Sequence, residues 1–131
     1  MGFSRARTFV FPVAAAAILA VGAGAHPASL SLPGGEAGIG FDDLRFAPAA
    51  SVLLAPAGRT GSLDLIDPAT RAVTAIGGFS STNLYRGGHG EGTTSADEGK
   101  GYLFATDRTA GELTVVDRTT SASSRRPARS G

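Results

Sequence analysis

Short apolar runs of about five residues, each followed by turn residues, occupy most of the chain after residue 40. Apolar residues do not recur at helical spacing there, and the sequence contains 19 glycines. Short runs of this kind are typical of antiparallel strands joined by tight turns. The pattern therefore predicts an all-β protein with few or no helices. The expected strands cover residues 41–46, 51–55, 62–66 and 71–76, followed by 93–96, 101–106 and 112–116.

Two local features support this interpretation. Asp67-Pro68-Ala69-Thr70 joins the third and fourth runs. Pro at the second turn position presets φ, and the Asp before it can accept a backbone N–H. The run 52–55 (Val-Leu-Leu-Ala) is apolar without alternation, so we expect both faces of that strand to be covered. A further short strand is expected at 29–32, ending at Pro33.

The chain also contains an internal repeat. Residues 61–67 (Gly-Ser-Leu-Asp-Leu-Ile-Asp) recur fifty positions later as Gly-Glu-Leu-Thr-Val-Val-Asp at 111–117. A one-residue slippage at Lys100 places Phe46-Ala47-Pro48 over Ser95-Ala96-Asp97, and Asp42 over Glu91. The copy fails after Asp117, where residues 121–126 have no apolar face. We expect the second copy to lack its last strand and residues 121–131 to form a disordered basic tail.

The two copies resemble the YVTN-type β-propeller repeat. In that repeat a strand of the type Leu-Tyr-Val-Ala is followed by a strand ending in Val-Ile-Asp. The resemblance implies an exported, seven-bladed propeller built from antiparallel four-stranded meanders, of which this chain would hold about two blades. The residues that carry it are Tyr102-Leu103-Phe104-Ala105 and Leu113-Thr114-Val115-Val116-Asp117, with Val52-Leu53-Leu54-Ala55 and Leu63-Asp64-Leu65-Ile66-Asp67 in the first copy. Blade 1 would span 41–78 and a partial blade 2 would span 93–120, joined by a Gly-rich loop at 79–92.

Seven blades of 40–50 residues need around 300 residues, so a chain of 131 residues departs from the family pattern. Two stacked blades would leave two apolar faces bare. Three interpretations follow. The chain is a truncated copy of a longer protein, which we favour because composition changes abruptly after Thr120; or it assembles into a ring of copies; or it is a small β-meander protein with only local likeness to propellers.

The beginning of the chain has the features of a secretory signal peptide at 1–25. Arg5 and Arg7 precede a short apolar run, and Ala23-Gly24-Ala25 ends it, so we expect cleavage after Ala25. An N-terminal segment at 26–40 would follow. The implied location is periplasmic or secreted, with no membrane contact after cleavage.

Composition narrows the choice of partners. The sequence has no cysteine, so an exported chain must fold without disulfides. Residues 26–120 carry 7 basic and 11 acidic side chains, which gives no electrostatic basis for binding nucleic acid. The motifs of serine hydrolases and of phosphate-binding loops are absent as well. We predict no catalytic residues and no cofactor.

Three residues are the candidate ligand contacts: Asp42, His89 and Glu91. Innermost propeller strands begin near the central channel, and residues 89 and 91 of a strand share one face. His89 and Glu91 could therefore contribute to a divalent-metal site, although two ligands are too few to complete one. The competing interpretation is that His89 hydrogen-bonds a carbonyl in an inter-blade turn.

The function expected from this pattern is non-catalytic binding or scaffolding, with an unidentified protein or small molecule as the ligand. Self-association through exposed blade faces is a further expectation. The alternative is a fragment of a propeller enzyme or of a metal- or cofactor-binding protein, either lactonase-like or redox-associated. Shape alone is a weak basis for that alternative.

Overall fold

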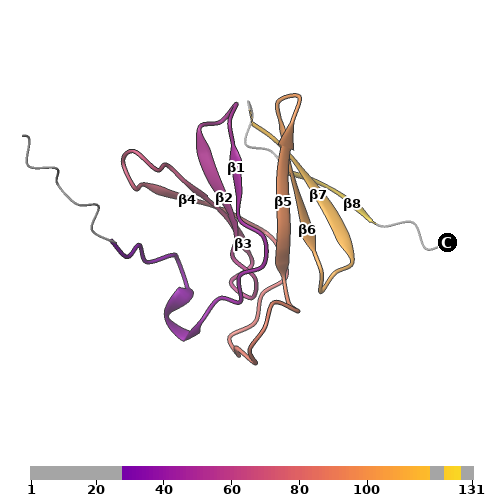
Figure 1. Ribbon diagram of the computed structural model, residues 1–131. Coiled ribbons are helices and arrows are strands. Elements are labelled where there is room, and N and C mark those ends of the chain that lie inside the picture. The colour runs from indigo at the N-terminus through magenta and orange to yellow at the C-terminus, as the bar shows by residue number, and fades with distance from the viewer. Residues whose placement is uncertain (1–27, 119–122, 128–131) are drawn as a thin grey trace, which may run out of the picture.

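The computed structural model describes residues 28–118 and 123–127, and it is an all-β structure of two antiparallel sheets lying side by side (Figure 1). This confirms the predicted all-β class. Sheet A contains β1 (Arg45–Ala47), β2 (Val52–Pro56), β3 (Ser62–Ile66) and β4 (Val73–Gly77), and sheet B contains β5 (Thr93–Gly99), β6 (Tyr102–Asp107), β7 (Glu112–Asp117) and β8 (Ser123–Pro127). The signal peptide expected at 1–25 lies outside the described residues. None of the helices in the described part of the chain is long and apolar enough to cross a membrane.

Strand pairing shows the internal repeat directly. In each sheet the strands pair in chain order, as a meander. Leu53 pairs with Ile66 in sheet A, and Leu103 pairs with Val116 in sheet B, fifty residues later. The same offset holds for the next pair of strands, because Ile66 faces Val73 and Val116 faces Ser123. Positions fifty residues apart are therefore structurally equivalent from β2 to β4 and from β6 to β8.

The prediction that the second repeat lacks its last strand was wrong. β8 pairs with β7 along its full length, so residues 123–127 are not a disordered tail. A strand edge offers unpaired N–H and C=O groups to any extended segment, whatever the polarity of its side chains. The apolar pattern could not reveal a strand selected by backbone pairing. The rest of the expected tail, 121–122 and 128–131, lies outside the described residues.

The N-terminal segment also differs from the prediction, because residues 29–32 form no strand. The N–H of Gly35 donates to the carbonyl of Leu32 at 3.1 Å, closing a turn through Pro33 and Gly34. The short 3₁₀ helix η1 (Gly35–Ala37) follows. Carbonyl groups of this segment receive hydrogen bonds from Arg59 instead of from a neighbouring strand.

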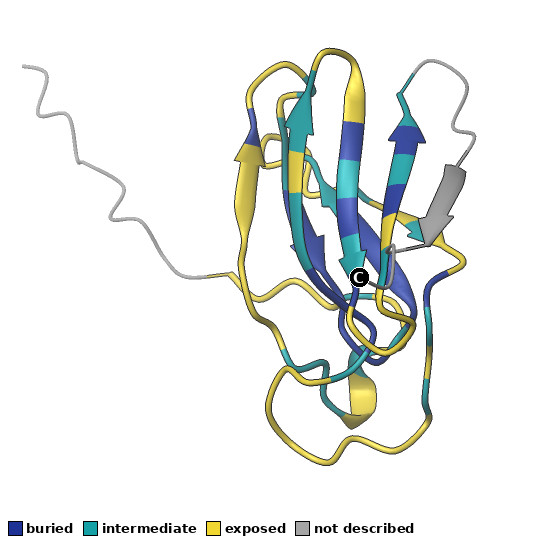
Figure 2. Ribbon diagram, turned by 90° about the vertical axis from the view of Figure 1, so that its right-hand side faces the viewer, coloured by how far each residue is buried: buried dark blue, intermediate teal, exposed yellow. Residues whose placement is uncertain are grey.

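The hydrophobic core lies between the two sheets (Figure 2). On the inner face of sheet A, Leu54 and Leu63 are 0% exposed. On the inner face of sheet B, Leu103, Ala105 and Val116 are each 1% exposed. Burying one leucine or valine side chain contributes about 1.5–3 kcal/mol relative to exposure. The packing of these two faces therefore holds the sheets together.

Two local predictions are confirmed. Leu54 and Ala55 point to opposite faces of β2 and are both buried, as the unbroken apolar run indicated. The Asp67 Oδ1 atom accepts the backbone N–H groups of Ala69 at 2.8 Å and Thr70 at 3.1 Å. These bonds hold the pKa of Asp67 below its ordinary value.

The sheets are also fixed to each other at both ends. At the end where β5 begins, Gly58 and Thr93 form a β-bridge, and Gly92 (φ +65°) packs so closely on the Gly58 carbonyl that a Cβ atom would collide with it. At the other end, the Glu98 Oε1 atom accepts the N–H of Ala49 at 2.7 Å, and Arg118 donates to the carbonyl of Ala49 at 2.9 Å. The relative placement of the sheets is thus set by backbone contacts as well as by the core.

The core assignment leads to a prediction about stability. Leu103→Ala should lower the free energy of unfolding by about 2–5 kcal/mol, because it leaves a cavity between the sheets. The matched control is Leu84→Ala in the loop between the sheets, where the side chain is 54% exposed. We expect that variant to stay within about 0.5 kcal/mol of the native chain. Urea denaturation followed by circular dichroism measures both, and equal effects would contradict the core assignment.

Candidate functional site

Loops gather at the end of the structure where β1 and β5 begin, and Arg59 organises them. Its side chain is buried and donates to three backbone carbonyls: Gly38 at 2.6 Å, Gly34 at 2.8 Å and Thr82 at 3.1 Å. It thereby ties the N-terminal segment and the loop 79–92 to the turn after β2. Hydrogen bonds from a charged donor are stronger than neutral ones, so this end is well fixed. Nothing in the sequence marked Arg59, because its partners are backbone atoms.

Two of the three predicted contact residues meet at this end. The His89 Nδ1 atom lies 2.7 Å from the Asp42 Oδ2 atom, and the side chains are 52% and 31% exposed. Glu91 lies nearby along the same loop and lines a small cavity of about 110 Å³ with Arg59. Within the described residues no three acidic or histidine side chains cluster as metal ligands would. The arrangement is a solvent-accessible polar pair beside a loop carboxylate.

The reason given for grouping Asp42 with Glu91 was wrong. Arg45 pairs with Leu54 in sheet A, and Asp97 pairs with Phe104 in sheet B. Because Leu54 and Phe104 are equivalent, Arg45 corresponds to Asp97, an offset of 52 residues. The turn between β5 and β6 is two residues shorter than that between β1 and β2, and this shortening produces the change. Asp42 therefore corresponds to the beginning of β5, near Thr94, and not to Glu91.

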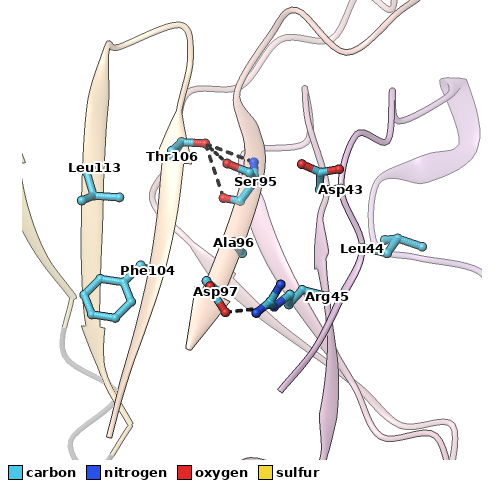
Figure 3. Close-up of a pocket in the computed structure, with 9 residues that line it drawn as sticks. All are labelled: Asp43, Leu44, Arg45, Ser95, Ala96, Asp97, Phe104, Thr106 and Leu113. Atoms are coloured by element: carbon cyan, nitrogen blue, oxygen red, sulfur yellow. Dashed lines mark hydrogen bonds and ion pairs between the residues drawn. The ribbon is translucent and has the colours of Figure 1, made fainter. Parts of the chain in front are cut away.

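A second site, which the sequence did not indicate, is a groove of about 490 Å³ beside β1 and β5 (Figure 3). Arg45 extends toward sheet B, where its Nε atom lies 3.0 Å from the Asp97 Oδ1 atom. Both side chains are more than half exposed. The groove is lined by Asp43, Leu44, Arg45, Ser95, Ala96, Asp97, Phe104, Thr106 and Leu113.

Hydroxyl groups make one wall of this groove polar. Thr106 Oγ1 lies 3.0 Å from Ser95 Oγ and 3.1 Å from Thr94 Oγ1, and it accepts the N–H of Ser95 at 3.1 Å. Phe104 and Leu113 supply apolar surface beside it. An open groove of this mixed character is suited to contact with a ligand or a protein surface.

Two carboxylates, Asp64 and Asp107, are buried and differ in their environment. Burial raises the pKa of Asp64, and the hydrogen bond from Ser62 Oγ at 2.8 Å offsets this only in part. Its second oxygen, Oδ2, has no hydrogen-bond partner. Burial alone would also raise the pKa of Asp107, but hydrogen bonds from the N–H groups of Ser80 and Ala110 lower it overall. Asp107 thus links the loop 79–92 to sheet B as a stable carboxylate.

The polar partner of His89 is a carboxylate. Among the described residues, the one polar contact of His89 is with Asp42, and no hydroxyl group hydrogen-bonds to its ring. A histidine base that activates a nucleophile should lie within hydrogen-bond reach of it. Comparisons with protein-family models, with curated proteins and with solved structures found no match.

The pKa shifts of two aspartates lead to opposite pH effects. Asp64→Asn should stabilise the chain at pH 7, because the folded state no longer holds a buried, half-satisfied carboxylate. The gain should shrink as pH falls through the raised folded pKa toward the ordinary value of 3.8, since the native Asp64 then becomes protonated. Urea midpoints of the variant and the native chain, compared at pH 7 and at pH values near 4, measure the effect.

Asp67→Asn is the control, because it should change the stability at pH 7 in the opposite direction. The pKa of Asp67 is lowered in the folded state, so its stabilising contribution is present above 3.8 and is lost as pH falls through the folded pKa. This variant should be less stable than the native chain at pH 7, with the difference closing in acid. A gain for Asp67→Asn, or a loss for Asp64→Asn, at pH 7 would contradict these assignments.

Proposed function

We propose that this chain is an exported, periplasmic or secreted β-propeller-repeat protein with a non-catalytic binding or scaffold role. Two four-stranded meanders with a repeated register, stacked through one face each, support this proposal. The arrangement of the strands supports it too, since β1 and β5 lie together at the centre while β4 and β8 lie at the outer edges (Figure 1). This is the layout expected of neighbouring propeller blades.

The observation that carries the binding role is that each sheet keeps apolar side chains in solvent on the face opposite the core. The outer face of sheet A includes Phe46, which is 52% exposed, with the partly exposed Leu53 and Ile66 on the same side. The outer face of sheet B includes Tyr102 and Leu113, 43% and 44% exposed, with Phe104 and Val115 partly exposed. Contiguous apolar surface of this kind marks interaction sites on soluble proteins.

The polar groups beside these faces would then orient a partner. Arg45 and Asp97 lie in the groove next to the outer face of sheet B. Asp42, His89 and Glu91 lie at the loop end, where a small polar ligand or a partner loop can reach them. Charged groups at the rim of an interface fix orientation more than they add affinity.

A dye that binds apolar surface tests this assignment. The chain carrying Phe46→Lys should bind 8-anilinonaphthalene-1-sulfonate at the remaining outer face of sheet B, so its fluorescence should fall when Leu113→Lys is added. The control adds Leu84→Lys instead, which places the same charge on a loop leucine that is 54% exposed, against 44% for Leu113. Circular dichroism confirms that each variant is folded. If both double variants bind the dye as strongly as the single one, the proposed contact surface is wrong.

The Asp42–His89 pair favours a second candidate function, binding of a divalent metal ion. A ligand that binds only the folded state raises the melting temperature, and the rise increases with the logarithm of ligand concentration over Kd. Under the first proposal, Zn²⁺, Ca²⁺ and Mg²⁺ should leave the melting temperature of the native chain unchanged. A Zn²⁺-dependent rise that His89→Ala abolishes and Arg86→Ala, in the same loop, preserves would favour the metal-binding alternative instead.

A further inference from the structure

We infer that the two outer faces bind each other between copies, so that the outer face of sheet B in one chain covers the outer face of sheet A in the next and the copies close into a ring. This gives the proposed binding role, on which it rests, a specific partner: a second copy of this chain. This contact would repeat the packing of sheet A on sheet B within one chain.

The repeat register shows what each outer face is equivalent to. At the fifty-residue offset, Leu53, Ala55 and Ile66 on the outer face of sheet A correspond to Leu103, Ala105 and Val116, the inner face of sheet B. On the other side, the outer face of sheet B corresponds to the inner face of sheet A. The equivalent pairs there are Tyr102 with Val52, Phe104 with Leu54, Leu113 with Leu63, and Val115 with Leu65.

Each outer face therefore resembles the inner face of the other sheet, and the two inner faces bury each other within the chain. The inner face of sheet A is buried by the inner face of sheet B. Apolar residues occupy all seven equivalent positions in both copies, although Tyr102 and Leu113 are nearly half exposed in the single chain, whereas Ala55 is already buried. Phe46, also on the outer face of sheet A, corresponds to Glu98 of sheet B. The outer face of sheet B would meet the outer face of sheet A of another copy with the same pairing of residue types as the buried interface.

Charged groups also occupy equivalent positions in the two sheets, with opposite signs. Arg45 and Asp97 occupy equivalent positions on β1 and β5, and inside one chain they form an ion pair at 3.0 Å (Figure 3). In a head-to-tail assembly, Asp97 would be followed by Arg45 of the next copy. The charges along the first strands would then alternate around the whole ring, with opposite signs at every contact between sheets. A contact between the outer faces of two copies of sheet B would instead bring two Asp97 side chains together.

The contact joins two different surfaces, so it is heterologous and propagates from copy to copy. Heterologous contacts form rings when the rotation between subunits closes. Propellers close with about 4–8 four-stranded sheets, which corresponds to roughly two to four copies of a chain with two sheets.

The first test is the mass of the purified full chain in solution, by size-exclusion chromatography with multi-angle light scattering. We expect one discrete oligomer of roughly two to four copies, as the propeller range requires. Phe46→Lys and Leu113→Lys should each convert it to monomer, whereas Leu84→Lys should not. A native chain that stays monomeric, or an oligomer that neither face variant disturbs, would overturn the inference.

Mixing the two face variants tests the head-to-tail direction. The Leu113→Lys chain keeps an intact outer face A, and the Phe46→Lys chain keeps an intact outer face B. An equimolar mixture should therefore form one-to-one dimers that cannot close, while each variant alone does not. Dimers formed by either variant alone would indicate a contact between identical faces and would contradict the proposed direction.

Exchanging the charges of Arg45 and Asp97 tests the proposed ion pairs between the first strands of neighbouring sheets. Arg45→Asp and Asp97→Arg should each weaken assembly, because like charges then meet at every contact, and the double variant should restore it. Exposed ion pairs contribute little to stability, so the single variants should remain folded. If the double variant assembles no better than the single ones, the charge argument is wrong. Monomeric chains that still bind the dye at the outer faces would overturn self-assembly while leaving the binding role in place.

Discussion

The structure depends on the burial of one face of each sheet against the other. A four-stranded antiparallel sheet with apolar residues on both faces cannot bury either face by itself. Pairing Leu54 and Leu63 with Leu103, Ala105 and Val116 resolves the problem for one side of each sheet. The Gly58–Thr93 bridge and the Glu98–Ala49 contact act at the two ends of this packing. The groove and the loop end are arranged along the margin where the two packed sheets meet.

How much of the fold the sequence could predict depended on which interactions select each strand. The strand Ser62–Ile66 was located at both ends, because its residues are covered by neighbours and Gly61 and Asp67 bound it with turn chemistry. β8 was missed, because pairing with the β7 edge selects it and its sequence has no apolar face. Residues 29–32 show the reverse case. Their alternating pattern suits a strand, but in the structure the chain turns at Pro33, and the carbonyl of Gly34 accepts a hydrogen bond from Arg59.

The site was predictable only in part, for a related reason. Asp42 and His89 meet in the structure, but the register argument that placed Asp42 over Glu91 was wrong, because two residues fewer in one turn shift every position in the preceding strand. Arg59 carries no sequence signal, since its partners are carbonyl groups brought together by three separate segments. The Arg45–Asp97 pair could be recognised only once the offset of 52 residues was known. Contacts that depend on turn length or on backbone partners can be recognised only from the structure.

The outer faces reveal a mismatch between sequence and exposure. Tyr102, Phe104 and Leu113 do not stabilise a face that stays exposed to solvent. Repeat proteins whose end faces remain in solvent usually carry polar residues there. Here the exposed positions keep the apolar character of Val52, Leu54 and Leu63, which the core buries. Apolar residues therefore lie on both sides of both sheets, although the outer faces also carry Asp64 and Thr106. Because the two outer faces repeat the two halves of the existing interface, the surface that best fits each of them is already present on the same chain.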